Sequence, residues 1–181
     1  MKKLILLLSW LIISNSVNAQ NEINLKGLVK LARQGELTAQ IELANAYRKG
    51  IGVTQDYKTA VKWFTLAAEQ GDAVAQYNLG IMHSFGLGVV PNYRPAIKWY
   101  TLSAEQGNAL AQYNLGRLYY LGKGVPENLV YAHLWAKQAS SNGFEMAAEL
   151  TELLTELMTE NQIEKAKRLE KECLIEQYKS C

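Results

Sequence analysis

The sequence predicts an all-α fold in which helix hairpins stack into a solenoid, and three observations support this prediction. Residues 37–144 form three consecutive blocks of 36 residues, namely 37–72, 73–108 and 109–144. The first two blocks are identical at 16 of 36 positions, and the last two at 14 of 36. Apolar residues recur at helical spacing in both halves of each block, and glycines end both halves. A hairpin of this size cannot bury its apolar faces alone, so stacked copies are expected.

The first 19 residues have the pattern of a secretory signal. Lys2 and Lys3 precede an apolar run over residues 4–13, and Val17 and Ala19 provide small residues at a cleavage site. An uncleaved anchor is the alternative, but the apolar run is too short to span a bilayer. We therefore expect cleavage after Ala19 and a mature chain that is periplasmic or secreted. No later segment is apolar enough to predict a membrane span, so no membrane contact is expected after cleavage.

The charge balance argues against a nucleic-acid partner. The chain has 19 Lys+Arg and 17 Asp+Glu, and the signal contains two of the lysines and no acid. Subtracting those two leaves 17 basic and 17 acidic residues in the mature chain. A neutral chain lacks the basic footprint of a nucleic-acid-binding protein.

The first half of each block predicts a helix that ends at a glycine turn. Alanines and leucines recur on one face of this helix, at Ala39, Ala75 and Ala111 and at Leu43, Leu79 and Leu115. The first glycine of each turn suits the left-handed residue after a helix, and the second keeps the turn free of side-chain clashes. The turns contain Gly50 and Gly52, Gly86 and Gly88, and Gly122 and Gly124. They lack the further residues of a phosphate-binding loop.

The second half of each block predicts a second helix with its own start signal. A residue that caps a helix N-terminus recurs at Asp56, Asn92 and Asn128. A tryptophan follows seven residues later, at Trp63, Trp99 and Trp135. We interpret the three tryptophans as anchors of the hydrophobic core; the alternative is that they form ligand cages.

Both ends of the repeat region predict caps. Residues 24–36 resemble the second half of a block, which predicts an N-terminal capping half-repeat over residues 20–36. Residues 145–181 predict C-terminal capping helices, in which Thr159 and Gln162 form a capping-box pair before a last helix that runs to about residue 177. A finite solenoid needs terminal units with a polar outer face.

Two cysteines, Cys173 and Cys181, lie near the C-terminus. On one continuous helix they would be about 12 Å apart, which is too far for a disulfide. A bond between them requires the chain to turn back after about residue 177. The alternative is one buried thiol and one exposed thiol, and both possibilities stay open.

The 36-residue blocks resemble the Sel1-like repeat, a relative of the tetratricopeptide repeat. The resemblance rests on AQYNLG, the GxGV loop, the Asp or Asn cap, AxxW and AEQG, at a period of 36 residues. It covers residues 24–143 and a variant C-terminal end. It implies a right-handed α/α superhelix that acts as an adaptor for protein–protein contacts. Exported bacterial members of this family are associated with envelope assembly, signalling and host interaction.

The alternative function is that of a cysteine-rich branch of the family, which is linked to β-lactam binding and hydrolysis. The sequence departs from that branch because none of the three repeats contains a cysteine. It also lacks Ser-x-x-Lys and Gly-x-Ser-x-Gly, the patterns of common serine nucleophiles. The histidines, His83 and His133, occupy packing positions without partners at metal-ligand spacing. We therefore expect no catalytic residue, metal site or cofactor.

A binding function should depend on positions that differ between the repeats. We expect six such residues in the first helices to lie on the inner surface and to contact a protein partner, although an ordinary solvent-exposed face is the alternative. They are Asn45, Arg48, Ile81, Ser84, Arg117 and Tyr120.

Overall fold

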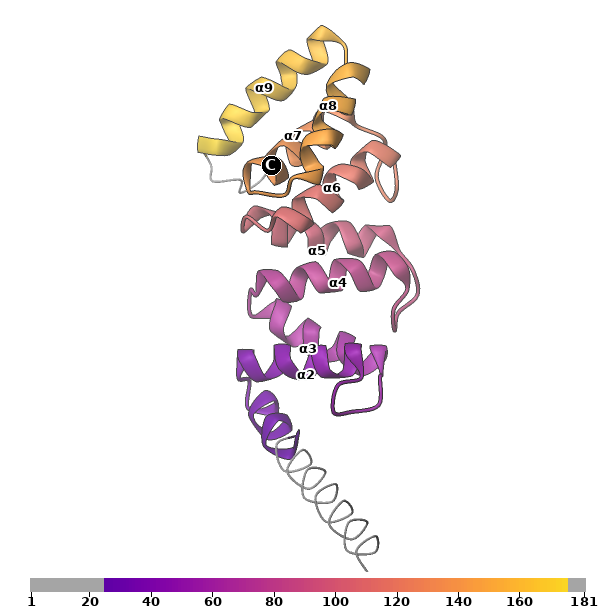
Figure 1. The fold of residues 1–181 in the computed structure, drawn as a ribbon, viewed down its shortest axis with the longest axis vertical. Coiled ribbons are helices and arrows are strands. Elements are labelled where there is room, and N and C mark those ends of the chain that lie inside the picture. Colours follow the sequence, from indigo (N-terminus) through magenta and orange to yellow (C-terminus); the bar gives the residue numbers. More distant parts are fainter. Residues whose placement is uncertain (1–24, 176–181) are drawn as a thin grey trace, which may run out of the picture. The chain divides into compact units, whose positions relative to one another are not determined.

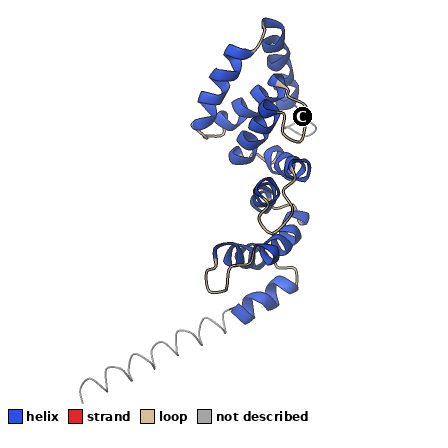
Figure 2. Ribbon diagram, turned by 90° about the vertical axis from the view of Figure 1, so that its right-hand side faces the viewer, coloured by secondary structure: helices blue, strands red, loops and turns tan. Residues whose placement is uncertain are grey.

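The computed structural model describes residues 25–175, and every regular element in this range is a helix (Figure 2). The all-α repeat architecture expected from the sequence is therefore confirmed. Within residues 25–175, no helix is both long and apolar enough to cross a lipid bilayer. The predicted signal, residues 1–19, lies outside the described residues. The chain divides into two compact units, unit 1 (Met1–Leu66) and unit 2 (Ala67–Cys181).

Unit 1 contains the N-terminal cap and most of the first repeat. Residues 25–33 form a helix, which is followed by α2 (Leu37–Lys49) and by α3 (Tyr57–Glu69), whose last residues belong to unit 2. Ala32 of the first helix packs with Ala39 and Leu43 of α2, and Trp63 of α3 covers this cluster. The helix at 25–33 thus covers the apolar face of α2, which is the role expected of a capping half-repeat.

Unit 2 contains two complete helix hairpins and two further helices. Its helices are α4 (Ala73–Phe85), α5 (Tyr93–Glu105), α6 (Ala109–Leu121), α7 (Leu129–Ser141), α8 (Met146–Leu157) and α9 (Glu160–Ile175). From α4 to α8 each helix packs against the next one in the chain, and α9 returns to pack against α7 (Figure 1). One core cluster joins α5, α6 and α7 through Tyr100, Leu115 and Trp135. This sequential packing of neighbours is the arrangement of a repeat solenoid.

The predicted start and stop signals of the helices act as expected, and Asp72 and Asn108 cap the first helices of the second and third repeats in the same way. The carboxylate of Asp72 accepts a hydrogen bond from the N–H of Ala75 at 2.6 Å, and Asn108 accepts one from Ala111 at 3.0 Å. Asp56, Asn92 and Asn128 accept equivalent bonds from the first turns of α3, α5 and α7. The first glycine of each turn has a left-handed backbone, with φ of 71° at Gly50, 71° at Gly86 and 60° at Gly122.

The sequence reasoning did not identify a glutamine that joins each repeat to the preceding helix. The side-chain amide of Gln40 donates to the carbonyl of Ala32 at 3.1 Å. Gln76 bonds to Ala68 at 3.2 Å and Gln112 to Ala104 at 2.9 Å, so the bond recurs every 36 residues. All three glutamines are buried. Each one gives a second donor to a carbonyl near the end of a helix, which also accepts the N–H of the glycine that follows the helix.

The buried glutamines of unit 2 also accept hydrogen bonds from the end of the second helix of their own repeat. Gln106 donates to the side-chain oxygen of Gln76 at 2.8 Å, and Asn142 donates to that of Gln112 at 2.9 Å. The recurring glutamine therefore belongs to a polar network that links consecutive hairpins. Gln76 and Gln112 are buried, whereas Gln106 and Asn142 are exposed, so the loss of one of these bonds would leave a buried polar atom only on the glutamine of the first helix.

Of the three tryptophans predicted to be core anchors, only Trp135 is fully buried, although Trp63 also packs against the core of unit 1. Trp135 is 1% exposed, whereas Trp63 and Trp99 are only half-buried. In the first two repeats the next residue is the buried aromatic anchor, namely Phe64 and Tyr100.

The degree to which each tryptophan is buried depends on the residue that directly follows it in the repeat. In the third repeat it is Ala136, so no ring separates the helices, and the backbone of α7 comes close to Gly116 of α6. There Trp135 itself enters the core cluster. In the second repeat the ring of Tyr100 occupies the space between the helices, and Trp99 is half-buried, with the ammonium group of Lys98 5.5 Å from its ring centroid.

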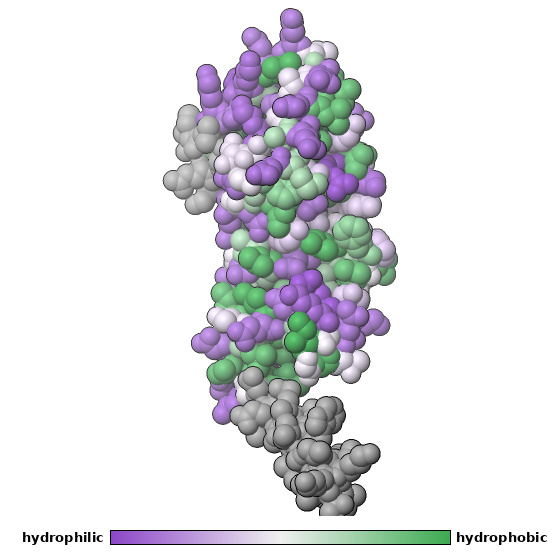
Figure 3. All heavy atoms as spheres, viewed as in Figure 1, coloured by the Kyte–Doolittle hydropathy of each residue, from purple (hydrophilic) through white to green (hydrophobic). Residues whose placement is uncertain are grey.

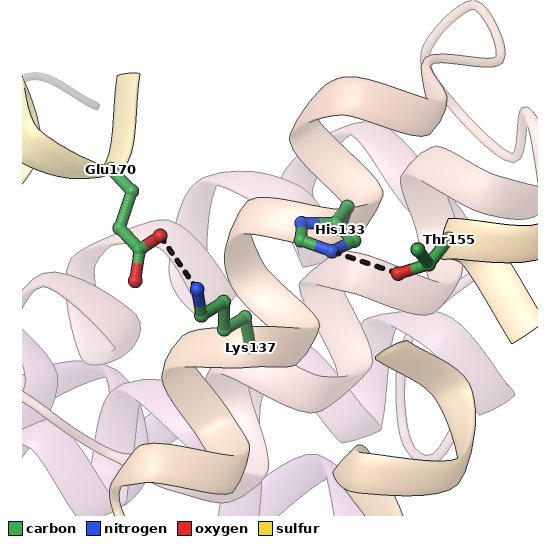
Figure 4. A network of polar contacts seen from close by, with 4 residues as sticks. All are labelled: His133, Lys137, Thr155 and Glu170. Carbon is green, nitrogen blue, oxygen red and sulfur yellow. Dashed lines mark hydrogen bonds and ion pairs between the residues drawn. The ribbon is translucent and has the colours of Figure 1, made fainter. Parts of the chain in front are cut away.

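The C-terminal helices cover the end of unit 2. Met158 and Ala166 pack against Val130 of α7. Lys137 of α7 and Glu170 of α9 form an ion pair at 2.8 Å, while His133 hydrogen-bonds Thr155 of α8 at 3.2 Å (Figure 4). The face drawn in Figure 3 is mostly hydrophilic over these helices, as expected of a terminal cap.

Two predictions about this end of the chain can be compared with the structure. The capping box is confirmed, because Thr159 and Gln162 bond to each other's backbone N–H groups at 3.3 Å and 2.9 Å. Cys173 is buried in α9. Cys173 is disulfide-bonded, so the alternative of a buried free thiol at this position is wrong. Cys181, the other cysteine of the expected pair, lies outside the described residues.

Candidate functional site

Unit 2 contains a hollow of about 120 Å³ between α4, α5 and α6. We call it the α4–α6 hollow. The residues around it come from two consecutive repeats and from the glycine turn after α6. They are Ser84, Phe85, Tyr93, Tyr100, Asn114, Arg117, Leu118, Leu121 and Lys123.

Helical spacing brings one wall of the hollow together. Asn114, Arg117 and Leu121 are three and four residues apart on α6, so they share one face of that helix. Leu118 is buried beside them. On the α4 side Phe85 is 72% exposed, and it forms an apolar rim with Leu121, which is 46% exposed.

Tyr100 supplies a buried hydroxyl to the hollow. Its side chain is only 2% exposed, and its hydroxyl accepts a long hydrogen bond of 3.5 Å from the hydroxyl of Ser84. Burial raises the pKa of Tyr100 to about 12, with the Ser84 bond and Arg117 acting in the opposite direction. The phenol therefore stays protonated at neutral pH, and its proton is available to an acceptor in the hollow.

Two cations flank the hollow, and each lies over an aromatic ring. The guanidinium of Arg117 is 5.7 Å from the ring centroid of Tyr113, and the ammonium of Lys123 is 5.5 Å from that of Tyr93. Such cation–π contacts restrict where long, flexible side chains can point. No carboxylate is among the lining residues, so the hollow has a net positive charge.

The turn that carries Lys123 is fixed by a close backbone contact. Gly124 has a φ of +79°, and a Cβ at this position would collide with the Cβ of Tyr93. Only glycine therefore allows the turn after α6 to lie against the start of α5. This contact places the neighbouring Lys123 at the hollow.

The geometry suits binding better than catalysis. Small-molecule sites usually enclose about 300–1,000 Å³, so a hollow of about 120 Å³ is small for a β-lactam or a similar ligand. Neither histidine lines it: His133 contacts Thr155, and His83 has a buried Nδ1 without a hydrogen-bond partner. Residues 25–175 contain no group of three or more His, Cys, Asp or Glu side chains that could hold a metal ion.

The structure brings together two of the six predicted partner-binding residues, Ser84 and Arg117. Ile81 packs against the core cluster that contains Tyr100. Tyr120 packs against Ala132, Ala136 and Leu154, on helices α7 and α8. The last two residues therefore contribute to packing, because their positions on the helices turn them toward neighbouring elements.

Asn45 and Arg48 lie in unit 1 and bond to each other. The amide of Asn45 donates to the carbonyl of Ile41 at 3.0 Å and accepts a bond from the guanidinium of Arg48, also at 3.0 Å. The Nε atom of Arg48 is buried without a hydrogen-bond partner. These two residues do not line the hollow in unit 2, so their role in partner binding stays a prediction.

Sequence reasoning missed most of the residues around the hollow. One signal could have identified part of this set, because Phe85 and Leu121 replace Lys49 at the same repeat position. That position lies one helical turn beyond Arg117 and its equivalents, on the same face. Tyr93 and Lys123 gave no comparable signal, because they reach the hollow only through contacts between two repeats.

Comparisons with known proteins agree with the repeat architecture. A family model described as Sel1 repeat matches residues 37–72, 73–108 and 109–144. A crystal structure of a protective antigen from uropathogenic Escherichia coli strains, which displays an SLR fold, is 38% identical with a TM-score of 0.65. The aligned region covers 66% of this chain and 26% of the antigen, so this chain spans about a quarter of that protein.

A second solved structure is similar over nearly its whole length. It is a Sel1 repeat protein from Oxalobacter formigenes, with 36% identity and a TM-score of 0.65, and the match covers 71% of this chain and 97% of that one. No curated protein matches the chain. The three consecutive family matches extend over more than half of the sequence, and the chain therefore belongs to the Sel1 repeat family.

Proposed function

We propose that this protein is an exported, non-enzymatic scaffold that holds a protein partner at the α4–α6 hollow. Sel1 repeats commonly form scaffolds for protein–protein interaction. The observation that carries the proposal is the hollow itself, in which polar groups of two repeats meet beneath an apolar rim. Aromatic residues and arginine are enriched at protein interfaces relative to the rest of the surface, and the hollow contains Phe85, Tyr93 and Arg117.

The composition of the repeats supports the same site. Residues that recur in all three repeats cap helices, end them or pack between them. By contrast, Phe85, Arg117 and Lys123 do not recur and are exposed. Arginine and aromatic residues are enriched among the residues that dominate binding energy at interfaces.

Export rests on the sequence pattern of residues 1–19. A signal peptide of this type would be removed after Ala19, which leaves a mature chain that begins at Gln20. The mass of the N-terminal peptide of the protein purified from its native host tests this step. A mature protein that retains Met1 would contradict it.

A pair of matched variants tests the binding site. Phe85→Ser/Leu121→Ser removes the apolar rim without changing any charge. Met146→Ser/Leu153→Ser removes two apolar side chains of α8, which are 58% and 43% exposed and lie outside the hollow. Tagged proteins are crosslinked in intact cells and purified, and the proteins that accompany them are identified by mass spectrometry.

We expect the partner to accompany the wild type and the α8 variant, and to be lost from the rim variant. Circular dichroism should show that all three proteins have the same helix content. Equal recovery of the partner with the rim variant and the α8 variant would contradict the proposed site.

A further inference from the structure

Building on the proposed function, we infer that the α4–α6 hollow binds an acidic side chain, Asp or Glu, in an extended segment of the partner protein. An apolar residue beside that acid would pack on the rim formed by Phe85 and Leu121.

The hollow contains hydrogen-bond donors that suit an anionic group. Arg117 and Lys123 are cations that donate and cannot accept, and the buried hydroxyl of Tyr100 has a proton to donate. No acidic residue lines the hollow to neutralise them. A carboxylate offers two acceptor oxygens and a negative charge, and an arginine can bind it through two parallel bonds.

Neighbouring residues hold the donors of the hollow in place before a ligand binds. Arg117 lies over Tyr113, Lys123 lies over Tyr93, and Tyr100 is fixed by its burial between α4 and α5. Side chains that are already ordered lose less conformational entropy when they bind. Both cations are exposed, and the ring below each of them restricts where its side chain can point.

The volume of the hollow limits what it can bind. A volume of about 120 Å³ accepts one side chain and excludes a folded domain or a large ligand. The backbone of the partner must then pass over the opening, where Phe85 and Leu121 offer apolar contact. This geometry fits an extended segment that alternates acidic and apolar residues.

The basic residues of α9 do not offer comparable chemistry. Lys165, Lys167, Arg168 and Lys171 share the groove on that helix with Glu164, and Arg168 also lies 4.0 Å from Glu172. Acids interspersed among the cations reduce the attraction for an anion. The α4–α6 hollow combines cations with a buried hydroxyl and contains no acid.

An array of short synthetic peptides of random sequence tests the inference without a known partner. Purified mature protein is applied to the array, and the residues enriched in the bound peptides are counted. For each bound acidic peptide, an isosteric version with Asn for Asp and Gln for Glu is synthesised. The dissociation constants of both versions are then measured by fluorescence anisotropy.

We expect enrichment of Asp or Glu next to Leu, Ile or Phe, and about tenfold weaker binding of each amide version, a factor that equals 1.4 kcal/mol. Arg117→Gln/Lys123→Gln should remove the preference for the acidic version. The matched control Arg94→Gln/Lys98→Gln removes two exposed cations of α5 outside the hollow and should keep it. Tyr100→Phe should weaken acidic peptides more than amide peptides, because it removes only the hydroxyl.

The inference is overturned if no peptide binds, if acidic peptides are not enriched, or if both double variants keep the preference. Binding to phosphatidylglycerol vesicles in place of peptides would also overturn it. The rim variants change no charge, so they test the proposed function separately. If Phe85→Ser/Leu121→Ser loses its partner while the array shows no preference for acids, the site is right and the inferred chemistry is wrong.

Discussion

Gly80 of α4 lies directly against the ring of Tyr100 of α5, so closely that a Cβ on Gly80 would overlap the ring carbons. The contact explains why this helix has a glycine in its interior, where glycine is otherwise unfavourable. It also keeps Tyr100 in a fixed place below the α4–α6 hollow. The packing of the second repeat and the shape of the candidate site therefore depend on the same pair of residues.

Gly80→Ala should destabilise the protein, because the buried ring of Tyr100 has little room to move. Overpacking of this kind typically costs about 1–3 kcal/mol in the free energy of unfolding. The control is Gly27→Ala, since Gly27 is also helical but has no atom near the position of an added Cβ. Urea denaturation should show a loss for the first variant and no loss for the second. Equal stability of both variants would show that the contact does not constrain the fold.

Tyr100→Ala should cost more than Trp99→Ala, although tryptophan is the larger residue. Replacement of a buried aromatic residue by alanine usually costs about 3–5 kcal/mol, and Tyr100 is buried whereas Trp99 is half-exposed. Tyr100→Phe keeps the ring and should lose much less stability than Tyr100→Ala. Thermal denaturation of the three variants gives the order, and a larger loss for Trp99→Ala would contradict the assignment of Tyr100 as the anchor.

Gln112→Ala should destabilise the stack by removing a buried hydrogen bond between consecutive helices. The carbonyl of Ala104 would lose this donor but keep the N–H of Gly107 at 2.9 Å, and the loss of one hydrogen bond typically costs about 0.5–1.5 kcal/mol. Asn114→Ala is the control on the same helix, because Asn114 bonds to Leu110 at a more exposed place. Chemical denaturation should place the control within about 0.5 kcal/mol of the wild type. Similar losses for both variants would argue against a special role of the recurring glutamine.

The stability of the protein should fall as the pH drops below the ordinary histidine pKa of 6.5. Burial lowers the pKa of His133; repulsion by Lys137 lowers it further, and attraction by Glu170 opposes both effects. Burial also lowers the pKa of His83. The unfolded chain therefore binds protons at a higher pH than the folded chain does. The stabilisation is complete above pH 6.5 and is lost as the pH falls toward the lowered pKa values.

Melting temperatures between about pH 7.5 and about pH 5.5 test this prediction in the range where histidine titrates. The double variant His83→Gln/His133→Gln should lose less stability over this range than the wild type does. A wild-type melting temperature that rises on acidification would contradict the direction of both pKa shifts.

The boundaries of the helices could be predicted because each depends on local chemistry. Asp72 and Asn108 cap helices through their own first turns, and Gly50 needs only its own backbone angles. The choice between Trp99 and Tyr100 as the anchor could not be made in this way. The two residues are adjacent, and which one is buried depends on the space that Gly80 leaves on another helix.

The candidate site could be predicted only in part for a similar reason. Ser84 and Arg117 differ between repeats and lie on first helices, and both observations come from the sequence. Lys123 reaches the hollow because the turn after α6 rests on Tyr93 of the preceding repeat. Contacts of this kind depend on how two repeats pack and leave no periodic signal in either one.

Site-specific photocrosslinking in intact cells tests most directly the claim that the partner lies at the α4–α6 hollow. A photoreactive amino acid replaces Leu121 on the rim in one variant and Leu153 of α8 in the other; the two leucines are 46% and 43% exposed. We predict that light produces a covalent adduct with one defined protein from position 121 and none from position 153. An adduct only at position 153, or equal adducts at both positions, would contradict the claim.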